Sequence, residues 1–150
     1  MTLGIGILGC GTVGGALVDL IEDQPGLEVR QVAVRSTTKA RSGRVDASIL
    51  TTNAESVVGR ADVDIVVEVI GGIEPARSLI LAALNAGKPV VTANKELIAN
   101  CGAELLAAAD RLGVDVICMV PDVGELAVDL VLDGWIPVGD VGSCRAYRRT

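Results

Sequence analysis

Histidine is missing from this sequence of 150 residues, and aromatic side chains are scarce, with no Phe, one Trp and one Tyr. The lack of histidine excludes Ser-His and Cys-His catalytic pairs and metal sites built on imidazole. The shortage of aromatics argues against a recognition surface anchored by large rings. The hydrophobic half of the sequence is therefore mostly aliphatic, which suits a parallel sheet covered by helices on both faces.

Excess positive charge and paired cysteines are also lacking. The net charge of -6 argues against a nucleic-acid partner, although basic residues gather between Arg30 and Arg44. Four cysteines occur, at Cys10, Cys101, Cys118 and Cys144. Their spacing fits neither a zinc site nor a disulfide framework. We therefore expect free thiols packed as small hydrophobic groups, in a reducing cytosol, and no metal site.

The first 18 residues carry no charge, which raises the question of a signal peptide or a membrane span. They have no basic start and no A-x-A cleavage pattern, and they contain six glycines. Such a glycine-rich segment is not typical of a membrane helix. The sequence predicts a soluble cytoplasmic protein without a membrane partner.

Predicted strands and helices alternate along the chain. Apolar runs predict strands at residues 3–8, 27–34, 64–70, 89–93 and 114–119, and helical spacing predicts helices at 12–22, 75–85 and 94–112. Residues 45–60 are ambiguous, with a short helix expected near 54–58. Such alternation indicates βαβ units, and right-handed crossovers then give a doubly wound, mainly parallel sheet with helices on both faces. Beyond residue 120 the pattern loosens, and we expect a helix over 122–133 and a strand over 141–148.

A G-x-G-x-x-G motif runs from Gly9 to Gly14, between the first predicted strand and the first predicted helix. In that context Gly9 permits a tight turn, Gly11 lets the backbone approach a pyrophosphate, and Gly14 lets the helix pack closely on the strand. The free N–H groups near Thr12 and Val13 would then face the phosphates. The motif predicts a Rossmann-type dinucleotide-binding domain.

The residues after the second predicted strand favour NADP as the cofactor, with NAD as a possible alternative. NAD sites usually have an acid there to hold the ribose 2′-hydroxyl. This sequence has no carboxylate between Glu28 and Asp46, and it offers Arg35, Lys39 and Arg41. A guanidinium at that place suits a 2′-phosphate. The alternative is a basic loop that only contacts solvent.

Three segments together resemble the homoserine dehydrogenase family: Gly9–Gly14, Glu68–Ala76 and Thr92–Leu97. The resemblance extends over residues 3 to about 117. It implies an oxidoreductase that interconverts aspartate semialdehyde and homoserine with NAD(P)H, in threonine and methionine biosynthesis. It also implies cofactor contacts from Thr12, Val13 and Arg35. Three further residues would flank the nicotinamide ribose, namely Gly71, Gly72 and Thr92.

Lys95 matches a lysine that the family uses at the reacting centre, so the resemblance implies a catalytic role. Its chemistry supports that role independently. A cation in the first turn of a helix opposes the helix dipole, which disfavours the charged form and eases proton transfer at neutral pH. The alternative is an exposed lysine in water. Glu68, inside a predicted strand, is equally compatible with a core carboxylate and with a functional one.

The resemblance fails after the last clear strand, where the family has a glutamate and a small-residue loop that holds a monovalent cation. Met119 stands at the place of the carboxylate, and only the glycine at Gly124 is kept. We therefore expect no such ion site, a dinucleotide-binding core over residues 1–119, a divergent segment over 120–150, and no substrate domain.

Without a substrate domain, the chain would be incomplete as an enzyme on its own. It would then act as a homo-oligomer or together with a chain that supplies that domain. Two alternatives stay open: a stand-alone NADP-binding module or sensor without catalysis, and a truncated remnant that binds nothing tightly.

Overall fold

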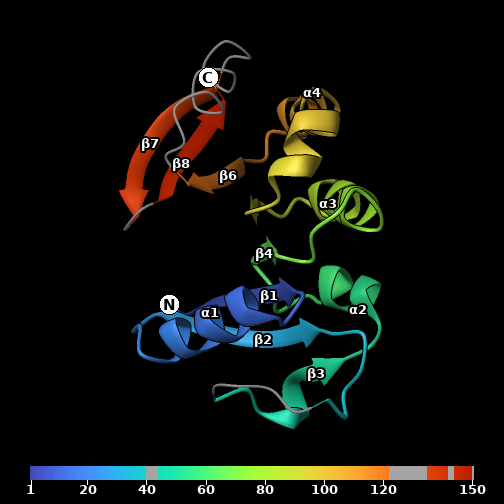
Figure 1. Cartoon of the computed structure of the whole chain (residues 1–150), viewed down its shortest axis with the longest axis vertical. Coiled ribbons are helices and arrows are strands. Elements are labelled where there is room, and N and C mark those ends of the chain that lie inside the picture. The colour runs from blue at the N-terminus through green and yellow to red at the C-terminus, as the bar shows by residue number, and fades with distance from the viewer. Residues whose placement is uncertain (40–43, 122–134, 142–143, 150) are drawn as a thin grey trace.

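One sheet runs through the computed structural model, which describes residues 1–39, 44–121, 135–141 and 144–149 (Figure 1). Its strands are β1 (Leu3–Leu8), β2 (Leu27–Ala33), β3 (Leu50–Thr51), β4 (Ile65–Glu68), β5 (Val90–Thr92), β6 (Val116–Pro121), β7 (Trp135–Val141) and β8 (Cys144–Arg149). They lie in the order β3-β2-β1-β4-β5-β6-β8-β7. The strands from β3 to β6 in this order are parallel, whereas β8 pairs antiparallel with both of its neighbours, β6 and β7. The predicted doubly wound, mainly parallel sheet is confirmed.

Helices cover both faces of this sheet, as predicted. They are α1 (Thr12–Glu22), α2 (Ala54–Gly59), α3 (Ala76–Asn85) and α4 (Lys95–Leu112), with a short 3-10 turn η1 (Ala47–Ile49). Val18 and Ile21 of α1 pack against Ile5 and Ile7 on one face. The other three helices share a second apolar cluster with Leu8 and other strand residues on the opposite face. Each fully buried aliphatic side chain stabilises the fold by roughly 1.5–3 kcal/mol.

The ends of α4 follow the chemistry of its sequence. Asn94 caps the helix, because its side-chain Oδ1 accepts a hydrogen bond from the Leu97 backbone N–H at 3.1 Å. Gly113 ends the helix in a left-handed conformation, with φ of 66°. Both signals are readable in the sequence, so the predicted bounds of this helix differ from the observed ones by a single residue.

Three features differ from the sequence-based expectations or lie beyond them. The ambiguous stretch contains the two-residue strand β3 before the expected short helix, and β3 forms because it pairs with β2. The final strand begins at Cys144 rather than at 141, and residues 135–141 form β7, which the sequence pattern did not indicate. The helix predicted over 122–133 lies outside the described residues.

The strand order reverses between β1 and β4, and this reversal determines where a ligand can enter. From β1 the chain proceeds outward through β2 and β3, then returns to β4 on the other side of β1. The loops after β1 and β4 therefore diverge and leave a crevice at the carboxyl edge of the sheet. Within the described residues, no helix combines the length and apolar character needed to cross a membrane.

Candidate cofactor-binding site

The glycine-rich turn connects β1 to α1 at that crevice. Gly9 has φ of 104°, and a Cβ there would lie 2.9 Å from the Val69 carbonyl oxygen. A Cβ on Gly14 would lie 2.4 Å from the Gly9 carbonyl oxygen. At Gly11, by contrast, φ is -85° and a Cβ would meet no described atom within 4 Å. The fold itself therefore requires Gly9 and Gly14, whereas the space beside Gly11 is free for a ligand.

The first turn of α1 is suited to an anion. Gly11 occupies the N-cap, where no side chain of the described residues caps the helix, and the first turn contains no acidic residue. Thr12 and Val13 are exposed, with Val13 at 60%. The backbone N–H groups at such a helix start point outward and carry the positive end of the helix dipole. Phosphate groups are common ligands of this arrangement.

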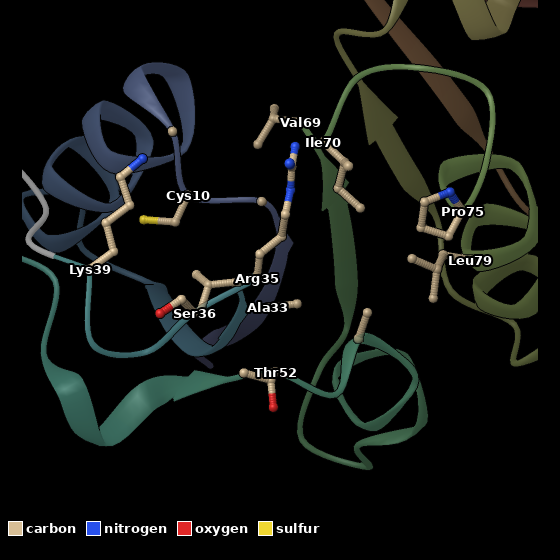
Figure 2. A pocket seen from close by; sticks show the side chains of 14 residues that line it. Cys10, Ala33, Arg35, Ser36, Lys39, Thr52, Val69, Ile70, Pro75 and Leu79 are labelled. Carbon is tan, nitrogen blue, oxygen red and sulfur yellow. The ribbon is translucent and has the colours of Figure 1, made fainter.

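A cleft of about 650 Å³ opens beside this turn (Figure 2). One part of its wall is the turn itself, through Gly9, Cys10 and Gly11. A second part follows β2 and contains Ala33, Val34, Arg35, Ser36 and Lys39. The remaining wall comes from three further segments, through Thr52, Ala54, Val69, Ile70, Pro75 and Leu79. The volume suits a small-molecule site, and the lining combines an apolar wall with a few polar groups.

Two cations belong to the cleft, and no carboxylate is among the described residues that line it. Figure 2 shows the Arg35 side chain extended over the cleft from the end of β2, in the direction of Val69. Lys39 lies on the same side as Cys10. The described lining of the cleft therefore contains two residues of positive formal charge, although the net charge of the chain is negative.

Other basic residues of the region point elsewhere. Arg30 pairs with Glu28 at 2.6 Å, and Arg44 pairs with Asp23 of the α1 end at 2.8 Å. The hydrogen bond with Arg44 lowers the pKa of the Asp23 carboxyl below its ordinary value. Arg41, a further candidate from the sequence, lies outside the described residues. The basic stretch thus divides into residues that line the cleft, Arg30 that pairs within β2, and Arg44 that pairs with the end of α1.

The predicted nicotinamide-end residues lie at the same sheet edge but do not line this cleft. Gly71 and Gly72 follow β4, and both have left-handed φ values of 82° and 74°. Thr92 ends β5 and is completely buried, so its side chain is turned away from solvent. Lys95 is exposed and is the first residue of α4. The structure thus separates the candidate residues into a group at the cleft and a group further along the edge.

Glu68 and Asn94 connect this second group, and the sequence did not reveal the connection. The Glu68 carboxylate accepts hydrogen bonds from the Ile70 N–H at 2.7 Å and from the Thr92 hydroxyl at 2.6 Å. Asn94 donates from its side-chain amide to the Gly72 carbonyl at 2.6 Å. Only the cap signal of Asn94 was readable from the sequence. The contact of Asn94 with Gly72 depends on the parallel alignment of β4 and β5.

The thiols of Cys10, Cys101 and Cys118 are free, as expected. Cys10 is half-buried in the cleft wall, whereas Cys118 is fully buried beside β5. Burial, and secondarily the charge of Glu68, raises the pKa of the Cys118 thiol to about 12. Cys118 therefore remains protonated at neutral pH and acts as a small core residue.

Comparison with known proteins identifies the relatives of this domain. The family model described as "Homoserine dehydrogenase, NAD binding domain" matches residues 9–119. The homoserine dehydrogenase of Synechocystis is 46% identical over 124 residues, which are 78% of this chain and 29% of the relative. That of Corynebacterium glutamicum is 45% identical over 146 residues, which are 87% of this chain and 33% of the relative.

Solved structures give the same result. A homoserine dehydrogenase from Thiobacillus denitrificans superposes with a TM-score of 0.67 at 41% identity, over 77% of this chain and 29% of that one. The Staphylococcus aureus homoserine dehydrogenase at pH 6.0 reaches a TM-score of 0.75 at 32% identity, over 83% of this chain and 35% of that one. The chain thus spans about a third of the length of these relatives. The resemblance read from the sequence is confirmed: the chain belongs to the homoserine dehydrogenase family, and residues 9–119 match the NAD-binding domain of that family.

Proposed function

We propose that this chain binds NADP(H) in the cleft between the glycine-rich turn and β2, as the cofactor-binding part of a homoserine dehydrogenase. The observation that carries this proposal is the open space beside Gly11, which lies between the uncapped start of α1 and the Arg35 side chain. A pyrophosphate fits this space because it can accept hydrogen bonds from the N–H groups at Thr12 and Val13. The residues present therefore fit a dinucleotide.

The choice of NADP over NAD depends on the cations at the end of β2. A ribose 2′-phosphate near Arg35 would receive a charge-assisted hydrogen bond, and Lys39 would add a second positive charge. An NAD ribose would lack the acid that normally accepts a hydrogen bond from its 2′-hydroxyl, since no carboxylate lines the described part of the cleft. These two facts support NADP as the tighter ligand and leave NAD as the weaker one.

The catalytic part of the proposal concerns Lys95. When bound, the nicotinamide ring supplies or accepts the hydride. Lys95 stands at the start of α4, on the sheet edge that also carries the Gly71–Gly72 loop. We assign to its uncharged Nζ the role of accepting the proton of the homoserine hydroxyl during oxidation and of returning it in the reverse reaction. The proposed reaction interconverts homoserine and aspartate semialdehyde and would belong to threonine and methionine biosynthesis.

Gly11→Val tests the phosphate site directly. The variant chain should fold normally, because φ at this position is -85° and a Cβ would meet no described atom. It should bind NADPH more than about tenfold more weakly, since the side chain takes the place of a group that accepts charge-assisted hydrogen bonds. Titration followed by NADPH fluorescence, with far-UV circular dichroism to check the fold, measures both properties.

Gly59→Val is the matched control, because a Cβ at Gly59 also meets no described atom and this residue does not line the cleft. This control should bind NADPH as the unmodified chain does. An unmodified chain that binds neither NADPH nor 2′,5′-ADP would disprove the proposed function. Unchanged affinity in a folded Gly11→Val variant would disprove the phosphate site at this turn.

A further inference from the structure

A buried carboxylate at the end of β4 has no part in the function proposed above. Glu68 is completely buried, and its neighbours in register on β1 and β5 are Leu8 and Thr92, which are also fully buried. Desolvation of a carboxylate is costly unless hydrogen bonds compensate for the lost water. An aliphatic residue would fill the same buried position between Leu8 and Thr92 without the desolvation cost. The presence of a carboxylate therefore needs a specific explanation.

Three hydrogen bonds compensate the Glu68 carboxylate, and two of them come from the loop that follows β4. Its Oε1 accepts from the backbone N–H groups of Ile70 at 2.7 Å and Gly71 at 3.2 Å. Its Oε2 accepts from the Thr92 hydroxyl at 2.6 Å. The loop N–H groups that bind Glu68 therefore point into the protein. They are occupied by an internal anion and are not offered to a ligand.

The same chain of hydrogen bonds continues to the start of α4. The Thr92 hydroxyl oxygen accepts from the Asn94 backbone N–H at 3.1 Å. The Asn94 side chain then donates to the Gly72 carbonyl at 2.6 Å and accepts from the Leu97 N–H at 3.1 Å. One closed network thus joins the loop after β4 to the helix turn that carries Lys95.

We propose that Glu68 and Thr92 are positioning residues that fix the Gly71–Gly72 loop against the start of α4. The loop held in this way would contact the nicotinamide half of the dinucleotide and add to its affinity. This inference rests on the proposed function and deepens it. The two side chains are buried and line no part of the cleft, so they act through the backbone that they hold. The outward surface of this loop is open, because a Cβ on Gly71 or Gly72 would meet no described atom within 4 Å.

The test separates the two halves of the cofactor. NADPH probes the whole dinucleotide, whereas 2′,5′-ADP probes only the adenosine half, which the Arg35 side of the cleft would bind. Thr92→Val keeps the branched shape suited to a strand but removes the hydroxyl that links Glu68 to Asn94. Both hydrogen bonds of this hydroxyl are lost, so the variant should bind NADPH about tenfold more weakly and leave 2′,5′-ADP binding unchanged.

Thr92→Ser is the rescue variant, because it retains the hydroxyl. It should bind both probes with nearly the affinity of the unmodified chain. If circular dichroism shows that Thr92→Val does not fold, Glu68→Leu carries the same expectation. Its aliphatic side chain can fill the buried space but accepts none of the three hydrogen bonds from Ile70, Gly71 and Thr92.

A purely structural role for this network predicts a different pattern. Equal weakening of both probes, or no weakening of either, would overturn the positioning role. An unmodified chain that binds neither probe would disprove the proposed function itself, and this result is distinct from the first two. Selective loss of NADPH affinity with rescue by serine is the result that supports the inference.

Discussion

At position 35 a guanidinium stands at the carboxyl end of β2, where an acid would hold the 2′-hydroxyl of NAD. We expect Arg35→Asp to weaken NADPH binding by about tenfold to a hundredfold, because a charge-assisted hydrogen bond is worth about 1.5–3 kcal/mol. NADH binding should change less, so that the preference between the two cofactors becomes smaller. Calorimetric titration of both cofactors against both chains measures this preference.

Arg111→Asp is the control for the change in net charge. Arg111 lies in the last turn of α4, roughly 25 Å along the helix from the carboxyl edge of the sheet, where α4 begins and the cleft opens. Charges at such distances are largely screened at physiological salt. The control should therefore retain the NADPH preference. If the unmodified chain bound NADH as tightly as NADPH, our interpretation of Arg35 would be wrong.

The residues of the site differ in how far the sequence could predict their place. The Gly9–Gly14 motif and Arg35 could be placed, because each directly follows a strand and parallel strands end at one sheet edge. The contact between Asn94 and Gly72 could not, because it joins residues 22 apart through the alignment of two strands. Arg44 was grouped with the other basic residues, yet its pairing with Asp23 directs it to α1.

Among the elements, the junction of β1 and α1 gives a prediction on stability. Gly14→Ala should destabilise the fold, because the new Cβ would lie 2.4 Å from the Gly9 carbonyl oxygen, which belongs to the backbone and cannot move easily. Overpacking of this kind costs about 1–3 kcal/mol or more. It should outweigh the gain of about 1 kcal/mol in helix propensity. Urea unfolding curves give the free energy of unfolding.

The same substitution in α4 should have the opposite sign. A Cβ on Gly102 would lie 3.5 Å from Ile98 Cγ2, an ordinary van der Waals distance. Gly102→Ala should therefore raise the free energy of unfolding by up to about 1 kcal/mol. If Gly14→Ala raised the free energy of unfolding as Gly102→Ala should, the close packing inferred at Gly14 would be wrong.

Regular elements were predictable where the pattern is strong and bounded by glycine or a cap. The bounds of β1 and α1 agree with the sequence, because an apolar run ends at Gly9 and helical spacing begins after Gly11. The short strand β3 was missed, because two residues give no periodic pattern and the strand exists only through its pairing with β2. The antiparallel pairing of β7 with β8 is likewise a property of the assembled sheet.

For the whole molecule, the two faces of the sheet are covered unequally. Three helices cover the face that carries Val66 and Val90, while α1 is the helix that the described residues place on the other face. Val91 and Ile117, on β5 and β6, are only half-buried.

The relatives are about three times as long as this chain. We predict that the residues of the cofactor site described above are not sufficient to bind and orient homoserine.

The 150-residue chain on its own should bind NADPH but should not turn over homoserine at a useful rate. Positioning two reactants in a well-formed site contributes on the order of 7–11 kcal/mol to catalysis. Lys95 is exposed at the start of α4, so the nicotinamide face beside it would remain wet. The measurement is NADPH formation at saturating homoserine and NADP⁺, with the purified chain and with Lys95→Ala.

A matched assay of the Corynebacterium glutamicum homoserine dehydrogenase, a relative of about three times the length, shows that the conditions support turnover. We expect steady NADPH formation with that enzyme, and none above background with this chain or with its Lys95→Ala variant. Cofactor binding without turnover is also what a stand-alone NADP-binding module would show. Steady turnover that disappears in Lys95→Ala would contradict the prediction, because it would mean that these 150 residues bind homoserine and complete the active site themselves.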